Sequence, residues 1–299
     1  MEQINGNETI VDKSLKEVKR HGSDGFPMGV YLDDFSHFQN GYICWHWHNE
    51  VQITLIIEGD FTCQVGNEKQ LLTPGDSIFI NSCALHQIIP CKKSFGKLYS
   101  FIWRADMLAG NMECDLYNEC IKNILDDSQK YYIYKNNNKD RAKLQATLMR
   151  IVSLYSEKQR FYKLKIYHQL TGIWMSLCDY SKENINTDSI MKLRDDERVK
   201  DAMKYMQEHF DENISLEDIA RATMISRSEL CKSFRRAVDT SPKEFLIQFR
   251  IRQSMSFLEK PELRIADIAE MTGFSSPSHF ASSFLRYVGC TPLQYRKNM

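Results

Sequence analysis

The N-terminal part of the chain shows short runs of apolar and polar residues in the alternation that is typical of β-strands. Turn signals rich in Gly, Pro, Asn and Asp separate these runs at 58–60, 66–67 and 74–76. Many short strands with such turns favour a sandwich or a barrel. The predicted strands are 42–48, 51–57, 61–65, 77–80 and 98–103.

From Asn111 the apolar period changes to that of helices. One stripe contains Leu144, Leu148, Ile151, Val152 and Tyr155, and a second contains Tyr167, Leu170, Ile173, Trp174 and Leu177. These helices either cover the strand-rich domain or make a homodimer, which doubles the contact with a binding partner. The pattern predicts an α+β chain of two domains. Its segments are a strand-rich domain with appended helices (1–110), a helical connecting and dimerisation segment (111–181), a polar linker (182–196) and an all-α domain (197–299).

The all-α domain contains an internal repeat at a nearly constant offset. Asp218, Ile219, Ala220, Thr223 and Ser226 recur as Asp267, Ile268, Ala269, Thr272 and Ser275; after one inserted residue, Leu230 and Phe234 recur as Phe280 and Phe284. Each copy reads as a short amphipathic helix, a tight turn and a second helix. This is the pattern of a helix-turn-helix, and two copies place two recognition helices on one chain.

Hydroxyl residues mark the predicted helix starts. Ser or Thr stands three residues before an acceptor in four places, as in a capping box: Ser215 with Asp218, Ser226 with Glu229, Ser241 with Glu244, and Thr291 with Gln294. A long helix at 242–258 is expected to join the two copies.

The exposed faces of the second helices are the candidate DNA contacts, because Arg and Lys bond to guanine edges or phosphates. In the first copy Leu230 and Phe234 are expected inside, which leaves Arg227, Ser228, Cys231, Lys232 and Arg235 outside. The second copy offers Ser276, Ser278 and Ser282. The first copy is therefore expected to supply more contacts with bases.

The C-terminal motifs resemble those of the AraC/XylS family of transcription regulators. The resemblance rests on Ile214–Ala220, Ser226–Phe234, Ser241–Leu246, Arg250–Leu258, Ile265–Ala269, Gly273–Ser275 and His279–Arg296. It implies a two-lobed helical domain that binds double-stranded DNA, in a regulator that is usually a ligand-controlled activator and works with RNA polymerase. The chain departs from the family at Met224, where the second copy has the turn glycine Gly273, and at Ser282, where a basic residue is usual.

The sharpest N-terminal feature is the series His46, His48, Gln52 and Gly59, followed by Pro74-Gly75-Asp76 and His86. On one continuous strand, His46, His48 and Gln52 would share a face. The series resembles the two cupin motifs, with Gln52 at the position where the family has Glu. This implies a cupin-like barrel as the sensor domain.

A small polar effector, such as a sugar, is predicted to bind at His46, His48, Gln52 and His86, because imidazole and amide groups both donate and accept. Trp103 is expected as an apolar wall of this pocket. Three imidazoles would also suit a transition metal, but Gln52 supplies no charge, so no metal and no cofactor is predicted. An ordinary half-buried strand that binds no ligand remains an alternative interpretation of this pattern. His21, His37, His168 and His209 lack such neighbours and are predicted at the surface.

Composition narrows the class of protein. The 299 residues are 42% hydrophobic and 26% charged, as in globular proteins, and no run is long enough to span a membrane. The nine cysteines form no C-x-x-C pair, and no secretory signal opens the chain, so a cytoplasmic location is expected. The formal net charge is zero, so charge alone does not indicate nucleic acid. A ligand-responsive regulator that is not an enzyme is therefore predicted. The alternatives are a metal-dependent cupin enzyme fused to a DNA-binding domain, and a constitutive regulator.

Overall fold

The computed structural model describes two compact units, which divide between Leu193 and Arg194. Its described residues are 11–12, 15–38, 41–92, 95–110, 112–127, 129–135, 140–182 and 189–297. Among these residues, no helix combines the length and the apolar character needed to cross a bilayer.

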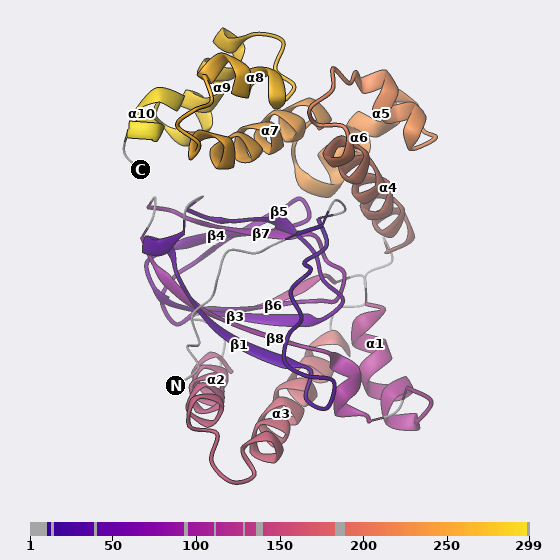
Figure 1. Cartoon of the computed structure of the whole chain (residues 1–299). Helices are drawn as coiled ribbons and strands as arrows, with labels where there is room; N and C mark the ends of the chain where they lie inside the picture. The colour runs from indigo at the N-terminus through magenta and orange to yellow at the C-terminus, as the bar shows by residue number, and fades with distance from the viewer. Residues whose placement is uncertain are drawn as a thin grey trace. The chain divides into compact units, whose positions relative to one another are not determined.

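The N-terminal unit contains two antiparallel sheets (Figure 1). In the described residues, one sheet has the order β1-β8-β3-β6-β9 and the other has the order β2-β7-β4-β5. The strands are β1 (Met28–Asp34), β2 (Ile43–His46), β3 (Val51–Glu58), β4 (Phe61–Val65), β5 (Glu68–Leu72), β6 (Ser77–Ile80), β7 (His86–Pro90), β8 (Lys97–Trp103) and β9 (Tyr131–Tyr134).

Helices cover the outer face of the five-stranded sheet (Figure 1). The longest are α2 (Arg141–Glu157) and α3 (Tyr162–Lys182); shorter ones are η2 (Ala105–Leu108), η3 (Tyr117–Ile121) and α1 (Lys122–Leu125). The short helix η1 (Phe35–His37) is not one of them, because Phe35 packs in the core between the two sheets. On β3, Ile53 and Leu55 pack towards these helices, whereas Ile56 packs between the two sheets. Both faces of this central strand are therefore buried, and Gln52 and Thr54 share the inner face with Ile56.

The predicted two-domain α+β fold is confirmed, with several local differences. Every predicted strand exists, but β1, β5, β7 and β9 were not predicted as strands, and β9 lies inside the stretch 111–181 that was predicted to be helical. Of the predicted linker, residues 183–188 lie outside the described residues, and from Ser189 the chain already belongs to α4. The predicted strand 42–48 is also shorter, because β2 ends at His46.

The C-terminal unit is helical, and its helices follow the predicted repeat (Figure 1). In the second helix pair the core is built from apolar residues of both helices, such as Ile268, Phe280 and Phe284, with Leu258 from the connecting helix. The helices are α4 (Ser189–Glu208), α5 (Leu216–Ala222), α6 (Arg227–Val238), α7 (Pro242–Leu258), α8 (Ile265–Met271), α9 (Pro277–Val288) and α10 (Pro292–Lys297).

The predicted helix starts are confirmed by their hydrogen bonds. Ser215 and Asp218 bond each other's main-chain amides at the start of α5, and Thr291 and Gln294 do the same at α10. Ser226 and Ser241 accept the amides of the third residues of α6 and α7, at 3.1 Å in both cases. Each bond satisfies an amide that the helix itself leaves unpaired.

The turn between α5 and α6 holds Met224 in the left-handed region, with φ of 53°. Gly273 has the same conformation in the second copy, with φ of 73°. A side chain in this region costs about 1–2 kcal/mol, because Cβ approaches the main chain. The Met224 side chain is 92% exposed, so packing does not offset that cost.

We expect Met224→Gly to stabilise the C-terminal unit by about 0.5–1 kcal/mol, which is the relieved strain less the entropy that glycine adds to the unfolded chain. Thermal unfolding followed by circular dichroism at 222 nm measures this. Ala222→Gly, at the end of α5, is the matched control and is expected to destabilise the unit, because that position is helical. A lower melting temperature for Met224→Gly would contradict the assigned strain.

Candidate effector site and nucleic-acid interface

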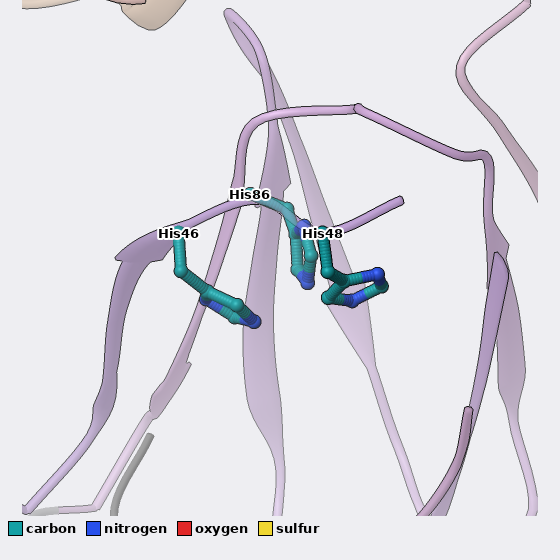
Figure 2. Close-up of side chains that lie close together, drawn as sticks. All are labelled: His46, His48 and His86. Atoms are coloured by element: carbon teal, nitrogen blue, oxygen red, sulfur yellow. The ribbon is translucent and has the colours of Figure 1, made fainter. Parts of the chain in front are cut away.

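Three histidines meet inside the N-terminal unit (Figure 2). His46 ends β2 and pairs in register with His86, which begins β7, while His48 lies just beyond β2. The ring centroids are 4.0 Å apart for His46 and His86, 5.3 Å for His48 and His86, and 5.7 Å for His46 and His48. Relative exposures of 3%, 2% and 0% for His46, His48 and His86 show that the cluster is enclosed.

His48 reaches this cluster in a different way from the one that the sequence predicts. His46 and Gln52 were expected on one continuous strand with His48 between them. The chain instead leaves the strand after His46 and re-enters a strand at Val51. His48 therefore reaches the cluster through a bend, not through the alternation of a strand.

The main chain fixes the orientation of each ring. A carbonyl oxygen can only accept, so an Nδ1 atom that faces one carries the proton and leaves a lone pair on Nε2. The three Nδ1 atoms donate to Cys44 O (from His46, 2.8 Å), Glu50 O (from His48, 3.0 Å) and Ala84 O (from His86, 2.9 Å).

Burial keeps these rings neutral near neutral pH. Desolvation disfavours the charged form and lowers the pKa of His46 to about 4. The same cause lowers the pKa of His48 and takes that of His86 well below its ordinary value. The cluster therefore presents neutral nitrogen donors.

Gln52 lies beside the cluster, as expected. Its side-chain oxygen is 3.0 Å from His48 Nε2, and its amide nitrogen is 2.8 Å from Thr54 Oγ1. A neutral His48 that donates from Nδ1 has only a lone pair at Nε2. The pair is therefore satisfied when the Gln52 amide is turned by 180° and its NH₂ faces the ring.

Two residues near the N-terminus join this site and were not predicted. Glu17 lies 3.4 Å from His21 Nε2, and the two side chains are 6% and 1% exposed. His21 Nδ1 is in turn 3.1 Å from Tyr31 OH. The prediction that His21 lies at the surface is wrong. The segment that contains His21 and Glu17 folds against the barrel, and Glu17 and Tyr31 are the contacts of the buried His21 ring.

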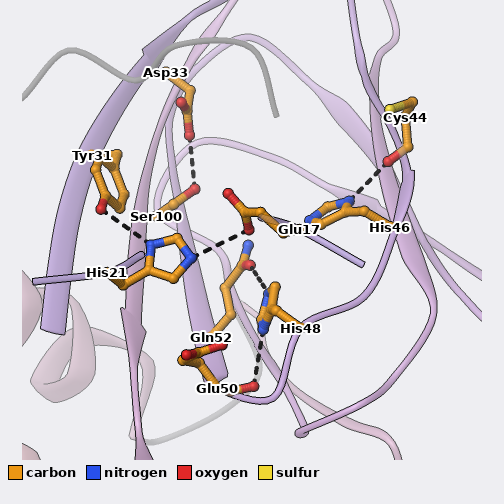
Figure 3. Close-up of polar contacts among 10 residues, drawn as sticks. All are labelled: Glu17, His21, Tyr31, Asp33, Cys44, His46, His48, Glu50, Gln52 and Ser100. Atoms are coloured by element: carbon orange, nitrogen blue, oxygen red, sulfur yellow. Dashed lines mark hydrogen bonds and ion pairs between the residues drawn. The ribbon is translucent and has the colours of Figure 1, made fainter. Parts of the chain in front are cut away.

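Glu17 is held in its charged form. Burial alone would raise the pKa of Glu17, but the contact with His21 and the electrostatic effect of His46, His21 and His48 outweigh it, so the pKa lies below its ordinary value. Figure 3 shows these groups around the Glu17 carboxylate.

A second buried carboxylate lies further along the barrel. Ser100 Oγ donates to Asp33 Oδ2 at 2.8 Å, and burial raises the pKa of Asp33 to about 6 (Figure 3). Ser100 pairs in register with Thr54 on β3. The polar alternation of Tyr31 and Asp33 in β1 was the available signal for this part of the site.

Trp103 does not join the site. It is fully buried, but it packs in the core between the five-stranded sheet and the helices. Its neighbour Ile102 pairs with Gln52, and Trp103 itself pairs with Val51. Trp103 therefore lies on the opposite face of the sheet from Gln52.

The histidine cluster fits a divalent transition-metal ion. One ring nitrogen from each of His46, His48 and His86 lies within 4.8 Å of the others. Neutral imidazoles whose Nδ1 protons are held by carbonyls are the usual form of metal-binding histidines. Among the described residues, His86 Nε2 has no hydrogen-bond partner although it is buried, so it is available as a ligand atom.

The predicted DNA-contact surface in the first copy lies on α6. Leu230 and Phe234 are fully buried, as predicted. Their burial turns the other face outward: Arg227, Ser228, Lys232 and Arg235 are exposed, and Cys231 is half-buried. Arg227 forms an ion pair of 2.8 Å with Glu217 of α5, in which both side chains are more than half exposed.

The matching surface of α9 is nearly uncharged. Ser278 and Ser282 are exposed, but the Ser276 hydroxyl accepts the His279 amide and caps the helix. At the position that corresponds to Arg235, Leu285 is 47% exposed. The exposed Arg286, which was not predicted as a DNA contact, forms an ion pair of 2.9 Å with Glu244. The basic part of the predicted DNA-contact surface is therefore concentrated on α6.

Both units of the chain match known protein families. A helix-turn-helix domain family matches residues 219–298, and a cupin domain family matches residues 37–93. The first match runs from within α5 through the second helix pair, and the second match contains the three clustered histidines.

Comparison with curated proteins places the whole chain among regulators. It is 30% identical over 291 residues to YdeC of Bacillus subtilis, described as an uncharacterized HTH-type transcriptional regulator, which covers 96% of this chain and 98% of that protein. It is 35% identical over 101 residues to the Msm operon regulatory protein of Streptococcus mutans, covering 34% of this chain and 36% of that one. It is 22% identical over 259 residues to the melibiose operon regulatory protein of Escherichia coli, covering 84% and 83%.

These relatives are regulators of transcription and not enzymes, and the tandem helix pairs are units that bind DNA. The chain therefore belongs to the AraC family of transcriptional regulators, with an N-terminal cupin domain and a C-terminal helix-turn-helix domain.

Proposed function

We propose that this regulator activates transcription when a small polar molecule, such as a sugar, binds inside the cupin barrel beside His46, His48, Gln52 and His86. The observation that carries the proposal is the convergence of these four buried polar groups in the unit that does not bind DNA. Burial of so many polar groups is costly unless they bond to one another or to a ligand.

The chemistry of the barrel interior suits a polyhydroxylated ligand. A sugar hydroxyl both donates and accepts, so its site needs acceptors and donors close together. The carboxylates of Glu17 and Asp33 supply acceptors, and the Gln52 amide and the Ser100 hydroxyl supply both. The names of the melibiose and Msm operon regulatory proteins support an operon-linked effector of this kind.

Regulation follows if the ligand prefers one arrangement of the two units. A ligand that binds two arrangements equally well shifts nothing, however tight its binding. The proposal therefore requires that the effector bind more tightly to the arrangement that holds DNA or RNA polymerase. A polar linker between α3 and α4, shorter than the predicted 182–196 because α4 begins at Ser189, would give the units room to change their arrangement.

A homodimer completes the proposal. Phe161, at the start of the α3 region, and Leu164 and Met175 on α3 are apolar and 61–68% exposed. Apolar side chains grouped on one helix support association of two copies. Two copies would double the contact with DNA and raise the effective concentration of recognition helices.

His48→Ala combined with His86→Ala is expected to remove the transcriptional response. A reporter gene behind the bound promoter is assayed with a panel of mono- and disaccharides. The unaltered chain should respond to one sugar, and the variant should lose at least tenfold of that induction, because two buried polar partners are gone.

His37→Ala is the matched control, since His37 lies at the surface with its side chain 82% exposed. The circular dichroism of each variant confirms that it folds. A full response from the double variant would place the effector elsewhere. Equal activation with and without every sugar would favour the constitutive regulator.

A further inference from the structure

The histidine cluster lacks the carboxylate that the cupin motif would supply, because Gln52 stands at that position. We propose that Glu17 supplies it from outside the motif, so that His46, His48, His86 and Glu17 together hold one divalent transition-metal ion. This proposal concerns a metal site and does not depend on the identity of the effector.

The backbone places Glu17 against the segment that carries two of the histidines. The Glu17 amide donates to Trp47 O at 2.9 Å, and Lys16 forms a parallel bridge with Trp47. Trp47 stands between His46 and His48 in the chain, so this bridge holds Glu17 next to the segment that carries both. The Glu17 side chain is 6% exposed and therefore points into the unit and not into solvent.

The charge of Glu17 is only partly balanced. His21 is 3.4 Å away, longer than the roughly 2.7–2.9 Å of a charge-assisted hydrogen bond. Lys19 also attracts Glu17, but it lies over the Tyr31 ring and is shared with Asp33. The three clustered rings donate their Nδ1 protons to carbonyl oxygens, so their Nε2 atoms carry lone pairs. A buried carboxylate near such lone pairs is a favourable place for a divalent cation.

His86 gives a second, independent indication. It is completely buried, and among the described residues its Nε2 atom meets no hydrogen-bond partner. Leaving a buried polar atom unpaired costs about 1–3 kcal/mol. This unpaired atom, His86 Nε2, belongs to the ring that lies closest to His46, and a metal ion at the cluster would use its lone pair.

The size of the cluster also fits a single ion. Zinc–nitrogen bonds are about 2.0–2.1 Å, so two nitrogens bound to one zinc ion lie at most roughly 4 Å apart. The three ring nitrogens already lie within 4.8 Å of one another. Small rotations of the rings would therefore bring their nitrogens within reach of one ion, and the Glu17 carboxylate, which lies outside this group, would reach the same ion by a rotation of its side chain.

The test uses the full chain, stripped with chelator and titrated with Co²⁺, whose visible absorption reports nitrogen and carboxylate ligation, followed by displacement with Zn²⁺. One equivalent should bind. Glu17→Gln keeps the size of the side chain and removes its charge. It should weaken binding at least tenfold, since even residues that only orient metal ligands contribute about 10–100-fold.

Asp76→Asn is the matched control, because it removes another buried carboxylate of the same unit, one that contacts Thr73 and Arg141 and not the histidines. It should bind Co²⁺ as the unaltered chain does. Adding Gln52→Glu to Glu17→Gln returns a carboxylate beside His48 and should restore binding, which a general folding defect would not allow.

Two results would overturn the proposal: absence of Co²⁺ and Zn²⁺ binding by the unaltered chain, or equal binding by the Glu17→Gln chain, which would exclude Glu17 as a ligand. Neither result bears on the sugar response, which the reporter assay measures separately. Likewise, the absence of any sugar response would not change the result expected from the Co²⁺ titration.

Discussion

Arg227→Ala combined with Lys232→Ala is expected to weaken promoter binding about a hundredfold or more and to remove its sequence selectivity. Both residues are exposed on α6, five positions apart. A basic side chain that bonds to a base edge contributes about 1–3 kcal/mol, and 1.4 kcal/mol is about tenfold in affinity. The neutral face of α9 offers little to replace them.

The measurement is selection of fragments from a genomic library by the purified chain, followed by titration of the enriched site at two salt concentrations. The unaltered chain should enrich one repeated site. The double variant should bind all fragments weakly, with a smaller dependence on salt because fewer phosphates are neutralised.

Two control variants distinguish the loss of specific contacts with DNA from a general loss of positive charge. Ser278→Ala with Ser282→Ala changes the matching positions of α9 and should cost only a fewfold loss. Lys92→Ala with Arg160→Ala removes two exposed positive charges from the N-terminal unit and should leave the affinity unchanged. Strong and selective binding by the Arg227→Ala/Lys232→Ala variant would show that the residues that contact the bases lie outside this pair on α6.

The helical unit could be predicted almost completely, because its signals are local. Capping residues such as Ser215 and Ser226 lie three residues from their partners, and the buried Leu230 and Phe234 recur at helical spacing. Even the exception at Met224 was visible as a missing glycine, and the structure confirms its left-handed conformation.

The barrel site could be predicted only in part, because it depends on contacts between distant segments. His46, His48 and His86 were found through their motif, although the strand argument for His48 was wrong. Glu17 has no periodicity around it, and its place comes from a bridge to Trp47 that only the fold reveals. Trp103 was assigned to the wrong face, because an aromatic residue on a strand buried on both sides does not show which core it joins.

The turn glycine of the second copy gives the other large effect that we expect. Gly273→Ala should destabilise the C-terminal unit by about 3 kcal/mol, from the left-handed strain and a direct clash. An added Cβ would lie 2.2 Å from Phe210 O and 2.8 Å from Arg250 Nη2. Arg250 Nε already donates to that same oxygen at 2.7 Å, and its Nη2 donates to Glu212 O. Both contacts must open to admit a methyl group.

Two unfolding probes distinguish this local effect from a general one. Trp45, Trp47, Trp103 and Trp174 all precede residue 194, so tryptophan fluorescence reports the N-terminal unit, whereas circular dichroism at 222 nm also reports the helical unit. Gly273→Ala should lower the transition seen by circular dichroism and leave the fluorescence transition in place. Met224→Ala at the equivalent turn should change neither, because that position already carries a left-handed side chain that is exposed. Equal losses at the two turns would contradict this account, because Met224→Ala adds no left-handed strain and disturbs no contact of Arg250 with Phe210 or Glu212.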